Sequence, residues 1–159
     1  MEPMVQQHLM SLRKTLEEVV APALGDNAFA AEQAGLIAAS LALLAEVQPH
    51  EDDLLRQEYA DLAAARVPLG LPPAPPPPDH RVALADAVHA LKQDQHEALL
   101  RITDVHGGEL PADLRATLAH WIDRQLLRES AWSRLTGFNP AGTQVPAIAE
   151  VLATQRETP

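Results

Sequence analysis

A proline tract near the middle of the 159-residue chain constrains the fold more than any other feature. It reads Leu-Pro-Pro-Ala-Pro-Pro-Pro-Pro over residues 71–78 and lies between two blocks of helical apolar periodicity. Consecutive prolines cannot continue a helix, and they favour the extended polyproline II conformation. At about 3.1 Å per residue, the segment 69–78 can cross about 30 Å. That length is enough to connect parallel rather than antiparallel helices.

The composition predicts a single helical domain rich in Leu and Ala. Hydrophobic residues make up 47% of the chain but aromatic residues only 3%, and no useful stretch alternates as a β-strand does. Leu and Ala both favour helix. We therefore predict an all-α bundle of four to five long helices plus a short C-terminal helix. The N-terminal helices fall in 1–66, the proline-rich connector in 67–79 and the C-terminal helices in 80–159.

Turn and capping residues place the helices along the chain. Pro22 ends the first helix, and Gly25-Asp26-Asn27 supplies turn and cap residues before the second. Pro49 separates the second from the third, Asp79 caps the fourth, and the pair Gly107-Gly108 ends the fourth. A turn at 137–140 follows the fifth helix. The helices are expected at about 4–20, 28–47, 50–66, 79–105, 111–135 and 145–156.

The first two helices carry apolar residues at regular spacing. In the first, a stripe with spacings of 4, 3, 4 and 3 runs down one face: Val5, Leu9, Leu12, Leu16 and Val19. In the second, one face carries Phe29, Gln33, Leu36, Ile37, Ser40, Leu41, Leu44 and Val47, and most other positions are Ala or Gly. Small residues allow neighbouring helices to approach on more than one side. We therefore expect the second helix to be the central one.

The charge and the amino-acid types present exclude several functions. The formal net charge of −10 disfavours a nucleic-acid partner, because phosphate binding needs clustered Lys and Arg. The absence of Cys removes disulfides, thiolate metal sites and Cys nucleophiles. The longest apolar run, 34–45, is short of the roughly 20 residues that span a bilayer, and the N-terminus lacks the pattern of a signal peptide. We expect a cytoplasmic protein with no membrane contact and no cofactor.

Two short histidine motifs suggest a possible metal site. Asp86 precedes His89 by three residues in the fourth helix, and His120 precedes Asp123 by three in the fifth. Side chains at this spacing share a helix face, and imidazole and carboxylate groups both bind first-row metals. A helical-bundle metal enzyme is therefore one alternative. The other interpretation is that both pairs are solvated surface contacts.

A stripe of aromatic and basic residues on the fifth helix suggests an interface. Trp121, Arg124, Arg128 and Trp132 recur at helical spacing. Trp and Arg are enriched where proteins bind each other. The alternative is that the tryptophans fill the core while the arginines pair with acidic residues. Both interpretations stay open at this point.

Three further features favour structure over chemistry. The segment His106-Gly-Gly-Glu109 resembles part of a phosphate-binding loop, but it follows a helix and no strand, which favours a helix C-cap. The serines lie inside helical pattern without a base at local spacing, so none is expected to be a nucleophile. The proline tract favours a connection over a ligand for a proline-recognising domain.

The order of elements resembles a small, functionally uncharacterised bacterial all-helical family often encoded beside acyl-CoA dehydrogenases and aminoglycoside-phosphotransferase-like kinases. The resemblance rests on Leu12, Leu16, Val20, Pro22 and Leu24, then Asn27-Ala28-Phe29 with Ala31 and Ala34, and later Gly108-Glu109-Leu110, Leu114 to Leu118 and Asn139-Pro140. These segments cover about half of the chain. The proline tract and residues 80–106 depart from the family pattern. The resemblance implies an accessory or partner role beside a kinase or an acyl-CoA enzyme, and it assigns no catalytic residue.

Three functional hypotheses follow from the sequence. The first is a non-catalytic acidic accessory protein that binds a protein partner or itself. The second is the metal-dependent enzyme that uses His89, His120 and nearby carboxylates. The third is an immunity-type inhibitor that meets a basic protein surface through its carboxylates, with an association rate that falls steeply as salt is added.

Overall fold

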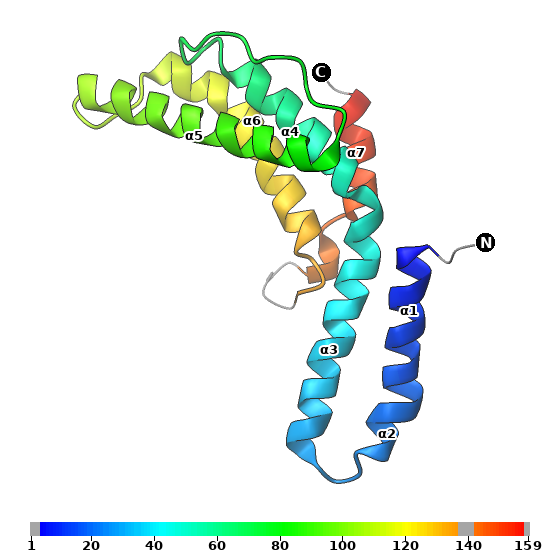
Figure 1. Ribbon diagram of the computed structural model, residues 1–159. Helices are drawn as coiled ribbons and strands as arrows, with labels where there is room; N and C mark the ends of the chain where they lie inside the picture. Colours follow the sequence, from blue (N-terminus) through cyan, green and yellow to red (C-terminus); the bar gives the residue numbers. More distant parts are fainter. Residues whose placement is uncertain (1–3, 137–141, 158–159) are drawn as a thin grey trace. The chain divides into compact units, whose positions relative to one another are not determined.

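A computed structural model describes residues 4–136 and 142–157, and within these ranges the chain forms helices, turns and connectors without a strand (Figure 1). The predicted all-α class is therefore confirmed. The turn expected at 137–140, which includes the Asn139-Pro140 pair, lies outside the described residues.

The chain divides into two compact units that interleave along the sequence. Unit 1 combines residues 1–51 with 129–151, and unit 2 combines 52–128 with 152–159. This division differs from the expected halves on either side of the proline tract. The difference arises because the helix before the tract packs with the helix after it, as the contacts within unit 2 show below.

Unit 1 begins with a helical hairpin. Its first arm contains α1 (Val5–Thr15), the π-helical segment η1 (Leu16–Val20) and α2 (Ala21–Ala23), and its second arm is α3 (Ala28–Val47). Pro22 lies inside the last turn of the first arm, and Gly25 turns the chain with a φ of 58°. The Asn27 side chain accepts a hydrogen bond from the Ala30 N–H at 3.0 Å, which caps α3 as the sequence predicts.

The alanine side of α3 receives the first arm. Ala34 and Ala38 are buried, whereas α1 itself has no buried residue. The side-chain amide of Gln6 donates to the Ala45 carbonyl at 3.0 Å and fixes the level of the two arms. Small residues on α3 thus let the helices approach closely, but much of the apolar surface of both arms stays outside this contact.

The rest of unit 1 comes from the second half of the chain. Ala131, Ile148 and Val151 are buried there. Arg134 binds both carboxylate oxygens of Glu46, with N–O distances of 2.5 and 2.9 Å. This hydrogen bond raises the pKa of the Arg134 guanidinium above its ordinary value.

Unit 2 is built mainly from three helices and a connector. A 3₁₀ turn, η2 (Gln48–His50), leads into α4 (Glu51–Ala65), so Pro49 changes the helix type without opening a loop. After the connector come α5 (Arg81–Val105) and α6 (Ala112–Trp132). A second 3₁₀ turn, η3 (Gly142–Gln144), precedes α7 (Ile148–Glu157), whose last residues belong to unit 2.

Two apolar clusters hold unit 2 together. The first joins α4 to the start of α5 through the buried residues Tyr59, Leu62, Leu84, Val88 and Leu91. The second joins the end of α4, the connector, α5 and α6 through Ala65, Leu69, Ala98 and Leu118. The α4 residues of the second cluster come later in the helix than those of the first cluster, and the same is true of the α5 residues. The two helices are therefore parallel.

The proline tract makes this parallel arrangement possible by running back along α4. Arg66 donates to the Pro72 carbonyl at 2.7 Å, the Tyr59 hydroxyl donates to the Pro75 carbonyl at 2.5 Å, and Arg56 donates to the Asp79 carbonyl at 3.3 Å. These partners lie successively closer to the start of α4 as the tract advances, and the ribbon shows the tract running back beside α4 (Figure 1). The extended crossover expected from the sequence is present in unit 2.

The ends of α5 show one difference and one agreement with the sequence. The N-cap is His80 rather than Asp79, and its side chain makes no capping hydrogen bond. At the other end, Gly107 and Gly108 have φ values of 69° and 93°, and the Gly108 N–H donates to the Thr103 carbonyl at 2.8 Å. This is a glycine C-cap, so the segment 106–109 ends a helix, as the sequence favours.

Candidate functional site

The histidine motifs lie on the surface of unit 2. Asp86 and His89 are exposed on α5, and His120 and Asp123 are exposed on α6. The ring Nε2 of His89 lies 3.1 Å from the Gln93 side-chain nitrogen. Within residues 4–136 and 142–157, no three His, Asp or Glu side chains come together in a way that would hold a metal ion. No described group of residues therefore supports the metal-enzyme hypothesis.

The arginines of the aromatic-basic stripe point into unit 2. The Arg128 guanidinium is only 2% exposed and lies 2.6 Å from Asp61 on α4. Arg124 binds the same carboxylate, with Nε–O distances of 3.2 and 3.3 Å. Trp121 packs against the second apolar cluster, and Trp132 is half-buried. The interpretation that fits these contacts is internal packing with ion pairs, rather than an open interface.

Gln155 near the end of the chain completes this arginine network. Its side-chain oxygen accepts from Arg128 at 2.7 Å, and its side-chain nitrogen donates to the Arg124 carbonyl at 3.0 Å. One nitrogen of Arg128, Nη2, is buried without a hydrogen-bond partner among the described residues. Because a buried guanidinium is costly unless a carboxylate compensates it, Asp61 has a structural role in unit 2.

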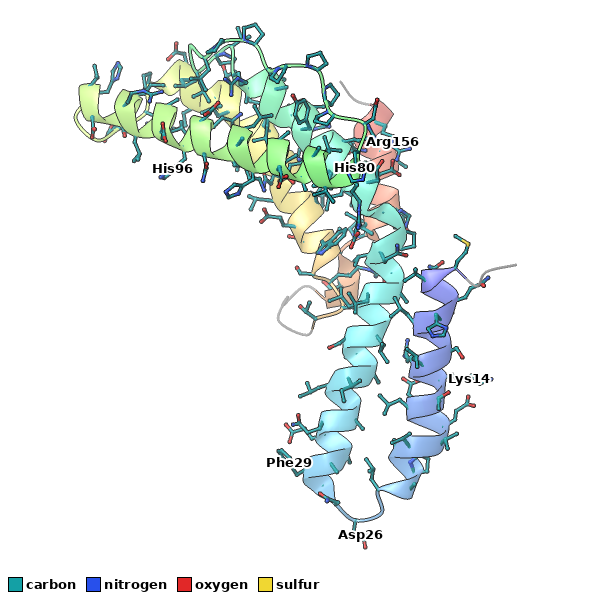
Figure 2. The ribbon with its side chains drawn as sticks, in the orientation of Figure 1. Lys14, Asp26, Phe29, His80, His96 and Arg156 are labelled. Carbon is teal, nitrogen blue, oxygen red and sulfur yellow. The ribbon has the colours of Figure 1, made fainter. Side chains whose placement is uncertain are left out.

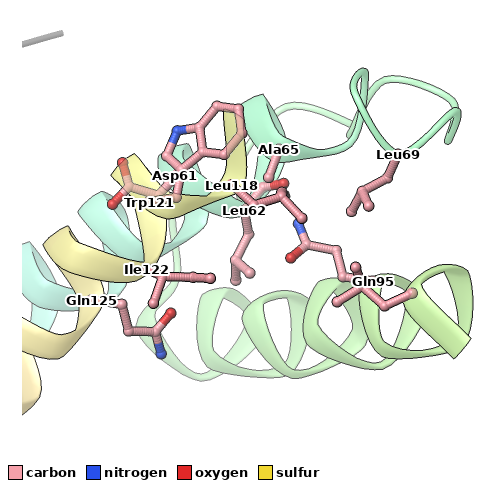
Figure 3. A pocket seen from close by; sticks show the side chains of 10 residues that line it. Asp61, Leu62, Ala65, Leu69, Gln95, Leu118, Trp121, Ile122 and Gln125 are labelled. Atoms are coloured by element: carbon pink, nitrogen blue, oxygen red, sulfur yellow. Dashed lines mark hydrogen bonds between the residues drawn. The ribbon is translucent and has the colours of Figure 1, made fainter. Parts of the chain in front are cut away.

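An apolar pocket lies between α4, α5 and α6. Its volume is about 110 Å³, and most of its lining is Leu, Ala, Trp and Ile, with Leu62, Leu118 and Trp121 among the side chains drawn in Figure 3. Two of its polar side chains are already engaged: Gln95 donates to the Leu62 carbonyl, and Asp61 binds the arginines. A space of this size holds a few water molecules or a very small apolar molecule. It presents no polar group in a catalytic arrangement.

Large apolar side chains are exposed along both arms of the helical hairpin of unit 1. On α3, Phe29 is 71% exposed, Leu36 57% and Ile37 53%. Phe29 lies on the side of α3 away from α1 (Figure 2). We define the hairpin face by eight of the exposed apolar residues of the two arms: Val5, Leu12, Val19, Val20, Phe29, Leu36, Ile37 and Leu44.

The charged residues of the first arm pair with one another away from α3. Arg13 binds Glu17 at 2.9 Å, and Lys14 lies 3.9 Å from Glu18. Lys14 points away from α3 (Figure 2). Each pair has the i, i+4 spacing of neighbours on one helix surface. The first arm therefore has a charged side and an apolar side, and the apolar side is only partly covered by α3.

Sequence reasoning found these residues but not their surroundings. The spacing predicts the apolar stripe on the first arm, but the stripe is only partly covered: Leu9 and Leu16 are half-buried, whereas Val5 and Leu12 are exposed. The sequence also predicts the face of α3 that carries Phe29, Leu36 and Ile37, but α3 contacts the first arm through its alanines instead. Spacing identifies an apolar side of a helix without showing what covers it.

The helical stretch from Ala28 to Ala65 is long and apolar enough, by length and composition alone, to cross a membrane. Core helices of soluble proteins can pass the same test, so this finding is weak evidence, and the sequence expectation of no membrane contact stays a prediction. Comparisons with family models, curated proteins and solved structures find no match to this chain.

Proposed function

We propose that this chain is a non-catalytic helical interaction protein whose hairpin face binds a protein partner, either a different protein or a second copy of the chain. The observation that carries the proposal is the exposure of large apolar side chains along α3, while the alanine side of the same helix receives the first arm. Contiguous exposed apolar surface of several hundred Å² marks binding sites on soluble proteins. The acidic surface elsewhere supports solubility.

Other features of the described chain fit a structural role better than a chemical one. The arginines on α6 hold unit 2 together through Asp61, and the pocket between the helices has its carboxylate already bound to them. The family resemblance suggests two kinds of partner: a phosphotransferase-like kinase or an acyl-CoA enzyme. Both kinds of partner remain part of the proposal.

Site-directed photocross-linking tests the proposal directly. Because the chain has no Cys, an Ile37→Cys variant carries one thiol, to which a benzophenone maleimide can be attached. We expect illumination in extract from producing cells, or with a purified candidate enzyme, to give adducts of discrete mass that mass spectrometry identifies. The matched control is Lys14→Cys, which places the same probe on the charged side of the hairpin.

The two positions should differ if the hairpin face binds a protein. Adducts from Ile37→Cys that are missing from Lys14→Cys support the proposal. Equal adduct patterns from both positions, or none from either, would contradict it. Circular dichroism of both labelled proteins checks that each keeps the helix content of the unsubstituted chain.

A further inference from the structure

We propose that the partner of the hairpin face is a second copy of this chain, so that two hairpins pack face to face as four helices. This inference rests on the proposed interaction function and names its partner. The spacing of the exposed residues, the level of the two arms, the size of the face and its lack of charge support it.

Both arms carry the same seam pattern. In the first arm, Val5, Leu9, Leu12 and Leu16 are spaced by 4, 3 and 4 residues; in α3, Ala34, Ile37, Leu41 and Leu44 are spaced by 3, 4 and 3. Such spacing is typical of helices that pack in bundles and coiled coils. A two-stranded coiled coil would cover every member of both seams. In this hairpin, only alternate members of each seam are covered by the other arm.

The exposed members of the two seams lie on the same flank of the hairpin. In each arm, an exposed residue precedes a covered one by four positions: Val5 precedes Leu9, Leu12 precedes Leu16, and Ile37 precedes Leu41. The exposed residue is therefore displaced from the covered one in the same rotational sense about each helix axis. Because the two helices are antiparallel, the same rotational sense places the exposed residues of both arms on the same flank of the hairpin.

The exposed residues also share levels along the hairpin. The hydrogen bond from Gln6 to the Ala45 carbonyl places Val5 near the level of Leu44. Leu12 lies seven residues after Val5, and Ile37 lies seven residues before Leu44. Because the arms are antiparallel, Leu12 and Ile37 therefore lie at about the same level. Large apolar side chains thus form layers that span both helices, as in one half of a four-helix bundle.

The size of the face matches that of a dimer interface. Arms of about 20 residues are about 30 Å long, and two helices side by side are about 20 Å wide. The flat area of the face is therefore about 600 Å², without the extra area from protruding side chains. A standard interface covers roughly 800 Å² on each partner. Two copies of the hairpin face would therefore bury about 1,200 Å² in total, at the lower end of the range for stable interfaces.

A second copy fits this face better than a lipid surface does. Insertion of the hairpin in a bilayer would bring Arg13, Lys14, Glu17 and Glu18 into hydrocarbon. The net charge of −10 repels anionic lipid. Between two copies, by contrast, the charged side of the first arm stays in water while the apolar sides meet.

Light scattering and sedimentation equilibrium of the purified chain test the inference, from micromolar concentrations to about 0.5 mM. We expect a mass that approaches twice the 17.2 kDa of one chain. The variant Leu12→Glu/Ile37→Glu places two charges in the central layer and should be a monomer with unchanged helix content. The control Lys14→Glu adds negative charge on the opposite side of the arm and should remain a dimer.

Cross-linking locates the contact. In an Ile37→Cys variant, a bis-maleimide that spans about 10 Å, the distance between packed helix axes, should join two chains. The same reagent should leave Lys14→Cys as single chains. Equal cross-linking at the two positions, or dimers of Leu12→Glu/Ile37→Glu, would place the contact elsewhere and overturn the inference.

The remaining outcomes separate this inference from the proposed function. A monomer at every concentration whose Ile37→Cys thiol reacts freely, and which photocross-links to another protein, overturns self-association but leaves the interaction function intact. A monomer whose thiol is protected shows that the chain covers its own hairpin face, and both proposals fail. Both also fail if the monomer binds vesicles of phosphatidylcholine and phosphatidylglycerol and Leu12→Glu/Ile37→Glu does not.

Discussion

Asp61 is the residue on which the arginine network of unit 2 depends. It binds Arg124 and Arg128 at once, and Arg128 is almost completely buried. The change Asp61→Ala leaves that guanidinium without a carboxylate, and breaking a buried pair in this way costs about 3 kcal/mol. We expect urea denaturation to show a loss of this size in the free energy of unfolding.

Two further variants test that explanation at the same scale. Adding Arg128→Met to Asp61→Ala removes the uncompensated charge and should restore part of the lost stability. Glu97→Ala, which breaks an exposed pair with Arg101 on α5, should change stability by no more than about 0.5 kcal/mol. If Asp61→Ala were as mild as Glu97→Ala, the network would have no structural importance.

Two glycines give a prediction at the scale of helices. Gly107 ends α5 with a positive φ of 69°, so Gly107→Ala should destabilise the protein by about 1 kcal/mol. Gly35 lies inside α3, and a Cβ there meets nothing within 4 Å. Gly35→Ala should therefore stabilise the protein by about 0.5–1 kcal/mol. Thermal unfolding followed by circular dichroism should show midpoints that move in opposite directions. A shift in the same direction for both would contradict the assignment.

Helices were predictable from the sequence because their ends depend on local chemistry. Asn27 caps α3, Gly107 and Gly108 close α5, and the proline tract rules out helix between α4 and α5 whatever surrounds it. The parallel arrangement of α4 and α5 also follows from the reach of that tract. Pro22 and Pro49 were less informative, because a proline in a terminal or 3₁₀ turn does not open the chain.

The surroundings of each helix were not predictable in the same way. Arg124 and Arg128 were candidate interface residues until Asp61, more than 60 positions away, was seen beside them. Spacing along one helix carries no information about a carboxylate on another. The hairpin face has the same origin: periodicity identifies Leu12 and Ile37 as apolar positions, and only the structure shows that they are uncovered.

The charge of the whole molecule determines how its association should respond to salt. Each chain carries a formal charge of −10, and the residues of the hairpin face are uncharged. Two copies therefore repel each other at long range and attract only through apolar contact. Raising the ionic strength from about 0.01 M to about 0.1 M shortens the Debye length from about 30 Å to about 10 Å and weakens the repulsion. We expect the dimer dissociation constant to fall by about twofold or more over this range.

The direction of that change distinguishes self-association from the inhibitor hypothesis. An acidic inhibitor that meets a basic protein surface loses association rate as salt screens the attraction between them. A homodimer of acidic chains gains affinity as salt is added, because salt screens the repulsion between the two negatively charged copies. Sedimentation equilibrium in a chloride series measures the effect, and Lys14→Glu, which makes the chain more acidic, should show the steeper dependence. A dissociation constant that rises with salt would mean that the two copies meet through complementary charges, and the hairpin face would not be the contact.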